Sequence, residues 1–90
     1  MRRRGYRAIT EDNARRRVRI NVRTLREGQS LTQGQAAARV KMHRRHWQKV
    51  EEGTVNLTLR TLTRLGVALG VDPVQLLEEP PRRRPGGSRS

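Results

Sequence analysis

The apolar residues of this chain recur at helical spacing, and this spacing constrains the fold more than any other feature. Between Thr58 and Gly70, leucines occupy positions 59, 62, 65 and 69, which places them on one face of a helix with 3.6 residues per turn. Thr58 can cap the start of this helix, and Gly70 can end it in a left-handed conformation. No segment shows the alternation of apolar and polar residues that is typical of a strand. We therefore expect an all-α fold.

Two further helices are predicted in the N-terminal half. Thr10 can cap the first, with Ile9 placed to pack on Ala14, and an apolar face follows at positions 18, 22 and 25. Arginines at positions 15, 16, 19 and 23 occupy the opposite face. The segment Thr32-Gln33-Gly34-Gln35 has the capping-box pattern and predicts a short second helix that ends near Val40.

Two more helices complete the prediction. His43 to Glu51 forms a third helix, which Gly53 ends, and Asp72 followed by a proline begins a short last helix that runs to about Leu77. Together the five helices make one compact domain over residues 10–78. Residues 1–9 form a basic arm, and residues 79–90 are rich in Pro, Gly and Arg; we expect both ends to be disordered.

Charge and composition restrict the function. The chain has 90 residues, no cysteine and a formal net charge of +13, so a polyanion, above all nucleic acid, is the first partner to consider. No segment has the length of apolar sequence that a membrane span needs, and we expect a cytoplasmic protein that is not an enzyme and has no cofactor. His43 and His46 fall on different sides of their helix, so we expect no metal site.

The only tryptophan, Trp47, stands in a basic run, KMHRRHWQKVEEG. On a wheel of about 100° per residue, Val50 and Glu51 share its side of the helix, as does His43. Stacking on unpaired bases would need more aromatic residues than this chain has. We therefore expect Trp47 to lie in the core and to anchor this helix.

With Trp47 facing inward, the basic residues of the third helix face outward. Arg44, Arg45 and Lys49 then form a surface that fits the major groove of DNA, where Arg and Lys donate to guanine O6 and N7. Gln33 and the first backbone amides of the second helix can bind a phosphate. We expect His43 to cap the third helix or to lie beside a phosphate.

The segment LTQGQAAARVKMHRRHWQKVEEG, from Leu31 to Gly53, resembles the helix-turn-helix core of the lambda-repressor-like, Cro-type family, also called the XRE family. The preceding LREGQS resembles the end of that family's first helix. The following NLTLRTLTRLGVALGVDPVQLL resembles its last two helices. The resemblance covers about Val18 to Leu77 and implies a five-helix DNA-binding domain.

The same resemblance implies roles for individual residues. Base-reading positions are occupied by Arg44, Arg45, Gln48 and Lys49, and phosphate-binding positions by Gln33, His43, Thr54 and Asn56. Arg26 and Glu51 match an internal ion pair. Where the family has a turn glycine this chain has Lys41, which implies a strained left-handed residue or a different turn.

Glu52 and two glycines also depart from the family pattern. Glu52 lies on the DNA-facing side, where its carboxylate repels phosphate; it can instead pair with Lys49 or accept from a cytosine amino group. Gly34 and Gly66 stand inside helices, each at a cost of about 1 kcal/mol relative to alanine. Gly66 allows close approach of a neighbouring helix.

These features predict a sequence-specific regulator of transcription, more readily a repressor than an activator, that binds double-stranded DNA. The alternatives are an antitoxin that neutralises a protein partner while it represses its own operon, and a non-specific nucleic-acid binder. The basic arm can add contacts with the DNA duplex through Arg2, Arg3, Arg4 and Arg7. We expect a homodimer at least on DNA, with Val55, Leu57 and Val74 available either for a symmetric contact or for the core.

Overall fold

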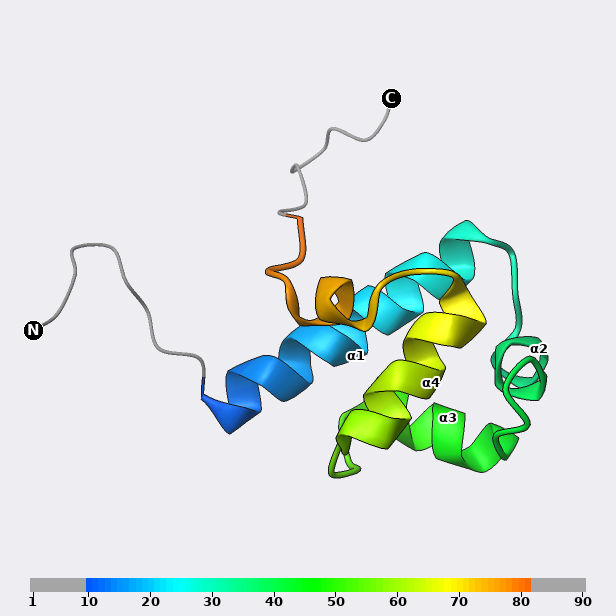
Figure 1. The fold of residues 1–90 in the computed structure, drawn as a ribbon, viewed down its shortest axis with the longest axis horizontal. Coiled ribbons are helices and arrows are strands. Elements are labelled where there is room, and N and C mark those ends of the chain that lie inside the picture. Colours follow the sequence, from blue (N-terminus) through cyan, green and yellow to red (C-terminus); the bar gives the residue numbers. More distant parts are fainter. Residues whose placement is uncertain (1–9, 82–90) are drawn as a thin grey trace, which may run out of the picture.

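The computed structural model describes residues 10–81, and within this range the chain is helical and contains no strand (Figure 1). Its elements are four α-helices, α1 (Glu11–Gly28), α2 (Gln33–Ala38), α3 (Arg44–Glu52) and α4 (Leu59–Leu69), and a 3₁₀-helix, η1 (Pro73–Leu77). The prediction of an all-helical fold is confirmed. The predicted contact of Ile9 with Ala14 lies outside the described residues.

Three α-helices begin at the threonines that the sequence predicts and two end at the predicted glycines, whereas α2 ends at Ala38 rather than near Val40. The hydroxyl oxygens of Thr10, Thr32 and Thr58 accept from the backbone amide three residues further on, and so satisfy donors that have no partner inside the helix. Gly53 and Gly70 end α3 and α4 in the left-handed conformation, with φ of 77° and 73°.

The prediction of five α-helices is wrong, because the last element is a 3₁₀-helix. Asp72 caps it through the Val74 amide at 2.9 Å, and Gln75 completes a capping box as predicted. The chain is already extended at Glu78, and two prolines follow Glu79. A proline disfavours helical backbone at the residue before it, here Glu79. Only a single tight turn therefore fits between Asp72 and Glu78.

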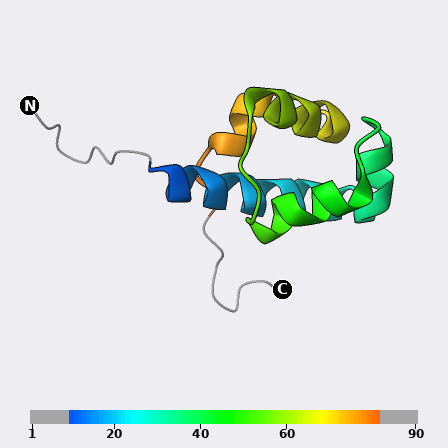
Figure 2. The same cartoon turned by 90° about the horizontal axis from the view of Figure 1, so that it is seen from below.

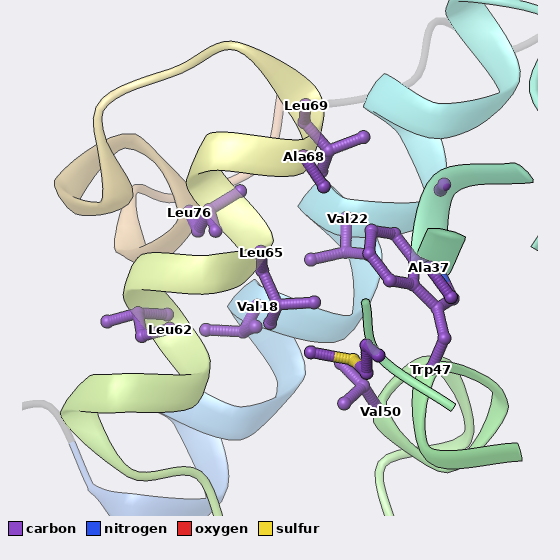
Figure 3. Packing of buried hydrophobic residues seen from close by; sticks show 12 residues of the cluster. Val18, Val22, Ala37, Trp47, Val50, Leu62, Leu65, Ala68, Leu69 and Leu76 are labelled. Atoms are coloured by element: carbon purple, nitrogen blue, oxygen red, sulfur yellow. The ribbon is translucent and has the colours of Figure 1, made fainter. Parts of the chain in front are cut away.

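The core lies where α1, α3 and α4 meet, and Figure 3 shows its side chains converging from all five elements. Trp47, Leu65 and Val18 are fully buried there. Leu59 is an exception to the predicted leucine face, since it remains 83% exposed. It is the first residue of α4 and lies before the part of the helix that packs on the core, so the buried stripe begins at Leu62.

The long helix α1 is the platform on which the other elements pack. It contacts α3, α4 and η1, while α2 joins α3 to α4 at one end (Figures 1 and 2). The buried side chain of Asn21 holds η1 in place by donating to the carbonyl oxygens of Leu76 at 2.9 Å and Glu78 at 2.8 Å.

Gly66 allows the chain to return closely past α4, and its near neighbours are Val71 in the turn and Pro73, the first residue of η1. A β-carbon at this position would lie 2.8 Å from the carbonyl oxygen of Val71 and 3.0 Å from Cγ of Pro73. The close contact is therefore with the turn that leads from α4 into η1.

Candidate nucleic-acid interface

One side of α3 is fixed in the core, and this orients its other side. Trp47 and Val50 are buried, as the wheel predicts, and the indole Nε1 of Trp47 donates to Oε2 of Glu51 at 2.6 Å. A buried tryptophan with a satisfied N–H both fills volume and fixes orientation. The helix therefore has a set rotation about its own axis, which decides which residues face outward.

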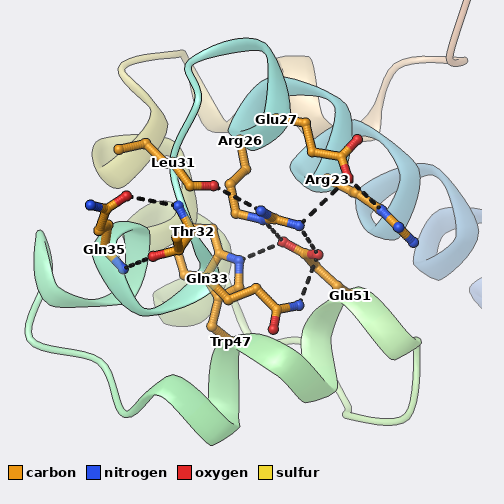
Figure 4. A network of polar contacts seen from close by, with 9 residues as sticks. All are labelled: Arg23, Arg26, Glu27, Leu31, Thr32, Gln33, Gln35, Trp47 and Glu51. Atoms are coloured by element: carbon orange, nitrogen blue, oxygen red, sulfur yellow. Dashed lines mark hydrogen bonds and ion pairs between the residues drawn. The ribbon is translucent and has the colours of Figure 1, made fainter.

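The carboxylate of Glu51 joins three helices (Figure 4). Nε of Arg26 in α1 donates to its Oε2 at 2.6 Å, and Nη2 donates to its Oε1 at 2.9 Å. Gln33, the first residue of α2, donates to Oε1 at 3.1 Å. With the bond from Trp47, four donors converge on one carboxylate, so α1, α2 and α3 are held at fixed positions relative to one another.

This ion pair is largely withdrawn from solvent, since the side chains of Arg26 and Glu51 are only 12% and 4% exposed. Burial disfavours the charged form of Glu51, but the hydrogen bonds from Arg26, Trp47 and Gln33 outweigh it and lower the pKa of this carboxyl. The hydrogen bond to Glu51 raises the pKa of Arg26. Glu51 is thus a structural anion beneath the candidate interface.

The outward side of α3 forms a continuous polar surface. His43, Arg44, Arg45, Gln48, Lys49 and Glu52 line a shallow groove of about 430 Å³. The four residues that we assigned to base reading therefore lie together on it. The amide of Gln48 donates to Oε2 of Glu52 at 3.2 Å, so this carboxylate is engaged by a neutral neighbour rather than by Lys49.

Arg44 lies on the flank of this surface beside α2. A β-carbon on Gly34 would be 3.4 Å from Cδ of Arg44, so the arginine stem runs over the first turn of α2. Arg45 and Lys49, in contrast, border the grooves on both flanks of α3. They therefore lie between the two grooves on the exposed face of α3, and we call this pair of residues the crest.

The four residues assigned to phosphate binding are not gathered in one place. His43 caps α3, its Nδ1 accepting from the backbone N–H of Arg45 at 3.3 Å. Gln33 donates its side-chain amide to Glu51. Thr54 is exposed just beyond α3, and Asn56 lines a separate apolar groove between the start of α4 and α1.

The turn between α2 and α3 contains the left-handed residue that the sequence raised as one alternative. Lys41 has φ of 54°, a conformation that costs a residue with a β-carbon about 1 kcal/mol or more. The guanidinium of Arg64 in α4 holds the turn by donating to the carbonyl oxygens of Val40 and Lys41. These hydrogen bonds tie α4 to the turn between α2 and α3.

Sequence reasoning did not assign Arg19 to the interface. Its stem lies against Gly53, where a β-carbon would be 3.1 Å from Cδ of Arg19, and with Arg15 and Arg16 it lines a groove that reaches Glu52. These arginines continue the polar surface of α3 onto α1. The sequence did show that these arginines share one face of the first helix. It did not show that this face would lie beside the C-terminal end of α3.

Three further expectations concern the N-terminal arm, membrane insertion and metal binding. Arg2, Arg3, Arg4 and Arg7 lie outside the described residues. Within residues 10–81, every helix is too short or too polar to cross a membrane. In the same range, His, Asp and Glu side chains form no group of three that could hold a metal ion.

Known proteins show the same kind of helical domain. Residues 15–78 match the model of a family described as a helix-turn-helix domain. The structure is similar to the crystal structure of the hypothetical transcription factor NHTF from Neisseria, with a TM-score of 0.73 and 25% sequence identity over 83% of this chain and 87% of that one. Among curated proteins, no sequence matches the chain.

Proposed function

This chain belongs to the helix-turn-helix domain family, and from that membership we propose that it is a sequence-specific regulator of transcription that reads the major groove of DNA with α3. The observation that carries the proposal is the exposed face of α3, where Arg45 and Lys49 form the crest of a helix anchored by Trp47. A rigidly oriented helix with long cationic donors suits base edges at the floor of the major groove.

Phosphate contacts would set the register of α3 on the duplex. Arg44 beside the first turn of α2 and Arg19 beside Gly53 lie near the two ends of α3. Cations near both ends of a helix in the groove can each meet a phosphate of the duplex. We assign Arg19 to backbone contacts, and Arg44 can meet a phosphate in addition to the base-reading role that we expect for it.

We further propose that the protein acts as a repressor of the lambda-repressor-like, Cro type. A domain of this size bound over a promoter excludes polymerase sterically, and this needs no second interaction surface. Two copies on a palindromic site would double the number of base contacts. Val74, which is 64% exposed on η1, is available for contact between the copies. Sedimentation of the DNA complex tests this part, because one subunit per site would exclude the dimer.

Equilibrium binding tests the proposed function. Fluorescence anisotropy at about 150 mM salt would compare the duplex upstream of the protein's own gene with a scrambled duplex and a single-stranded RNA of equal length. We expect the upstream duplex to bind about a hundredfold or more tightly than the other two. Equal affinity for all three would mean that charge alone drives binding and would overturn the proposal.

A further inference from the structure

The two crest residues of α3 present donors without any acceptor of their own. Arg and Lys side chains only donate hydrogen bonds. Within residues 10–81, neither Arg45 nor Lys49 forms an ion pair. Both side chains are exposed. Their hydrogen-bonding capacity is therefore available to a ligand on this face.

The nearest acidic group does not neutralise this pair of cations. Glu52 lies on the same groove but accepts from Gln48 at 3.2 Å. Gln48, the polar residue between the two cations, has thereby committed a donor to a neighbour inside the protein. Arg45 and Lys49 keep all their donors free for a ligand, while Arg44, which also has no ion pair within residues 10–81, lies at the flank of the groove beside α2.

Base edges in the major groove differ in how well they suit arginine and lysine, whose side chains only donate. Guanine offers two acceptors, N7 and O6, whereas adenine pairs its acceptor with an amino donor. Cytosine presents a donor, and thymine presents one acceptor beside a methyl group. An arginine can bind both guanine acceptors as a fork, which makes guanine the best complement to this crest.

Resting on the proposed function, we infer that each half-site contains two guanines within about two base-pair steps of each other, one read by Arg45 and the other by Lys49. The two residues stand four apart on α3, which corresponds to a rise of about 6 Å along the helix axis. Successive base pairs in DNA are separated by about 3.4 Å. The separation of the two side chains therefore spans about two steps.

Base analogues test this inference without disturbing the protein. A preferred duplex is first selected from random sequence, and each guanine in it is then replaced singly by 7-deazaguanine, which lacks the N7 acceptor. Inosine, which keeps N7 and O6 but lacks the minor-groove amino group, is the matched control. We expect 7-deazaguanine to weaken binding about tenfold at two positions within two steps, and inosine to leave binding there unchanged.

Protein variants assign the two guanines. Arg45→Ala should abolish the effect of 7-deazaguanine at one position and Lys49→Ala at the other. Arg60→Ala, which removes an exposed arginine from α4, should preserve both effects. Circular dichroism establishes that each variant is folded.

The outcomes separate this inference from the proposed function. A selected duplex that is A·T-rich at the contacted positions, or one whose guanines tolerate 7-deazaguanine, would overturn the guanine assignment while specific binding stands. Selection that yields no preferred sequence would refute the proposed function itself. Loss of binding with inosine but not with 7-deazaguanine would place the contacts in the minor groove and would also overturn the inference.

Discussion

Replacement of Glu51 by glutamine should cost the protein a large part of its stability. Four donors converge on this carboxylate, two on each oxygen: Arg26 Nε and Trp47 on Oε2, and Arg26 Nη2 and Gln33 on Oε1. In Glu51→Gln one oxygen becomes an NH₂ group. Whichever way the amide turns, two of the four donors face another donor instead of an acceptor.

The expected loss follows from the bonds that disappear. Hydrogen bonds that involve a charged group contribute about 1.5–3 kcal/mol each, so losing two costs about 3–6 kcal/mol. This agrees with the cost of about 3–5 kcal/mol for removal of one partner from a buried ion pair. Because small domains are stable by about 5–15 kcal/mol, this loss is a large fraction of the total stability.

Urea denaturation followed by far-UV circular dichroism measures this loss without relying on Trp47 fluorescence, which the substitution itself would change. The matched control is Glu52→Gln, an exposed neighbour whose replacement should alter the unfolding free energy by less than about 0.5 kcal/mol. A loss below about 1 kcal/mol in Glu51→Gln would refute the reasoning, because it would show that the carboxylate is not needed to hold the three helices together.

The same substitution has a predicted pH dependence. The pKa of Glu51 is lowered in the folded protein, so its contribution is fully present above the ordinary glutamate pKa of about 4.3 and is lost as the pH falls through the folded value. The stability difference between wild type and Glu51→Gln should therefore be constant above about pH 5 and shrink in acid. A difference that stays constant down to pH 2 would contradict this linkage.

Three other changes have defined outcomes in urea denaturation. Lys41→Gly should stabilise the protein by about 0.5–1 kcal/mol by relieving left-handed strain, whereas Lys41→Ala should bring no gain; equal effects would argue against strain. Asn21→Asp should cost about 1–3 kcal/mol, because the carboxylate cannot donate to the carbonyl groups of η1, and an unchanged midpoint would show that this clamp is dispensable. Gly66→Ala should destabilise the protein by about 1–3 kcal/mol, because the new β-carbon clashes with Val71. Gly34→Ala has room for a β-carbon and should stabilise the protein by about 0.5–1 kcal/mol. If the two substitutions changed stability in the same direction, the packing described at these glycines would be contradicted.

Local signals predicted where the helices begin, where α3 and α4 end, and the rotation of α3. Thr10, Thr32 and Thr58 each bond an amide in their own first turn, and such short-range contacts depend on nearby sequence alone. Trp47 was placed correctly because a chain with so few aromatic residues needs its largest side chain in the core.

Features that depend on distant parts of the chain were not predictable in this way. Periodicity gave the apolar face of α4 but not the length over which that face is covered, so Leu59 was misjudged. The position of Arg19 beside Gly53 depends on how α1 and α3 pack. The support of the turn by Arg64 likewise joins residues more than 20 positions apart.

The most direct test of the account compares the ratio of affinities for the upstream and scrambled duplexes in wild type, Arg45→Ala and Arg60→Ala. Both variants lose one exposed positive charge, so both should lose similar non-specific affinity. If α3 reads the DNA, the ratio falls about tenfold or more in Arg45→Ala and stays at the wild-type value in Arg60→Ala. Equal ratios in all three proteins would contradict the claim that the exposed face of α3 is the surface that reads sequence.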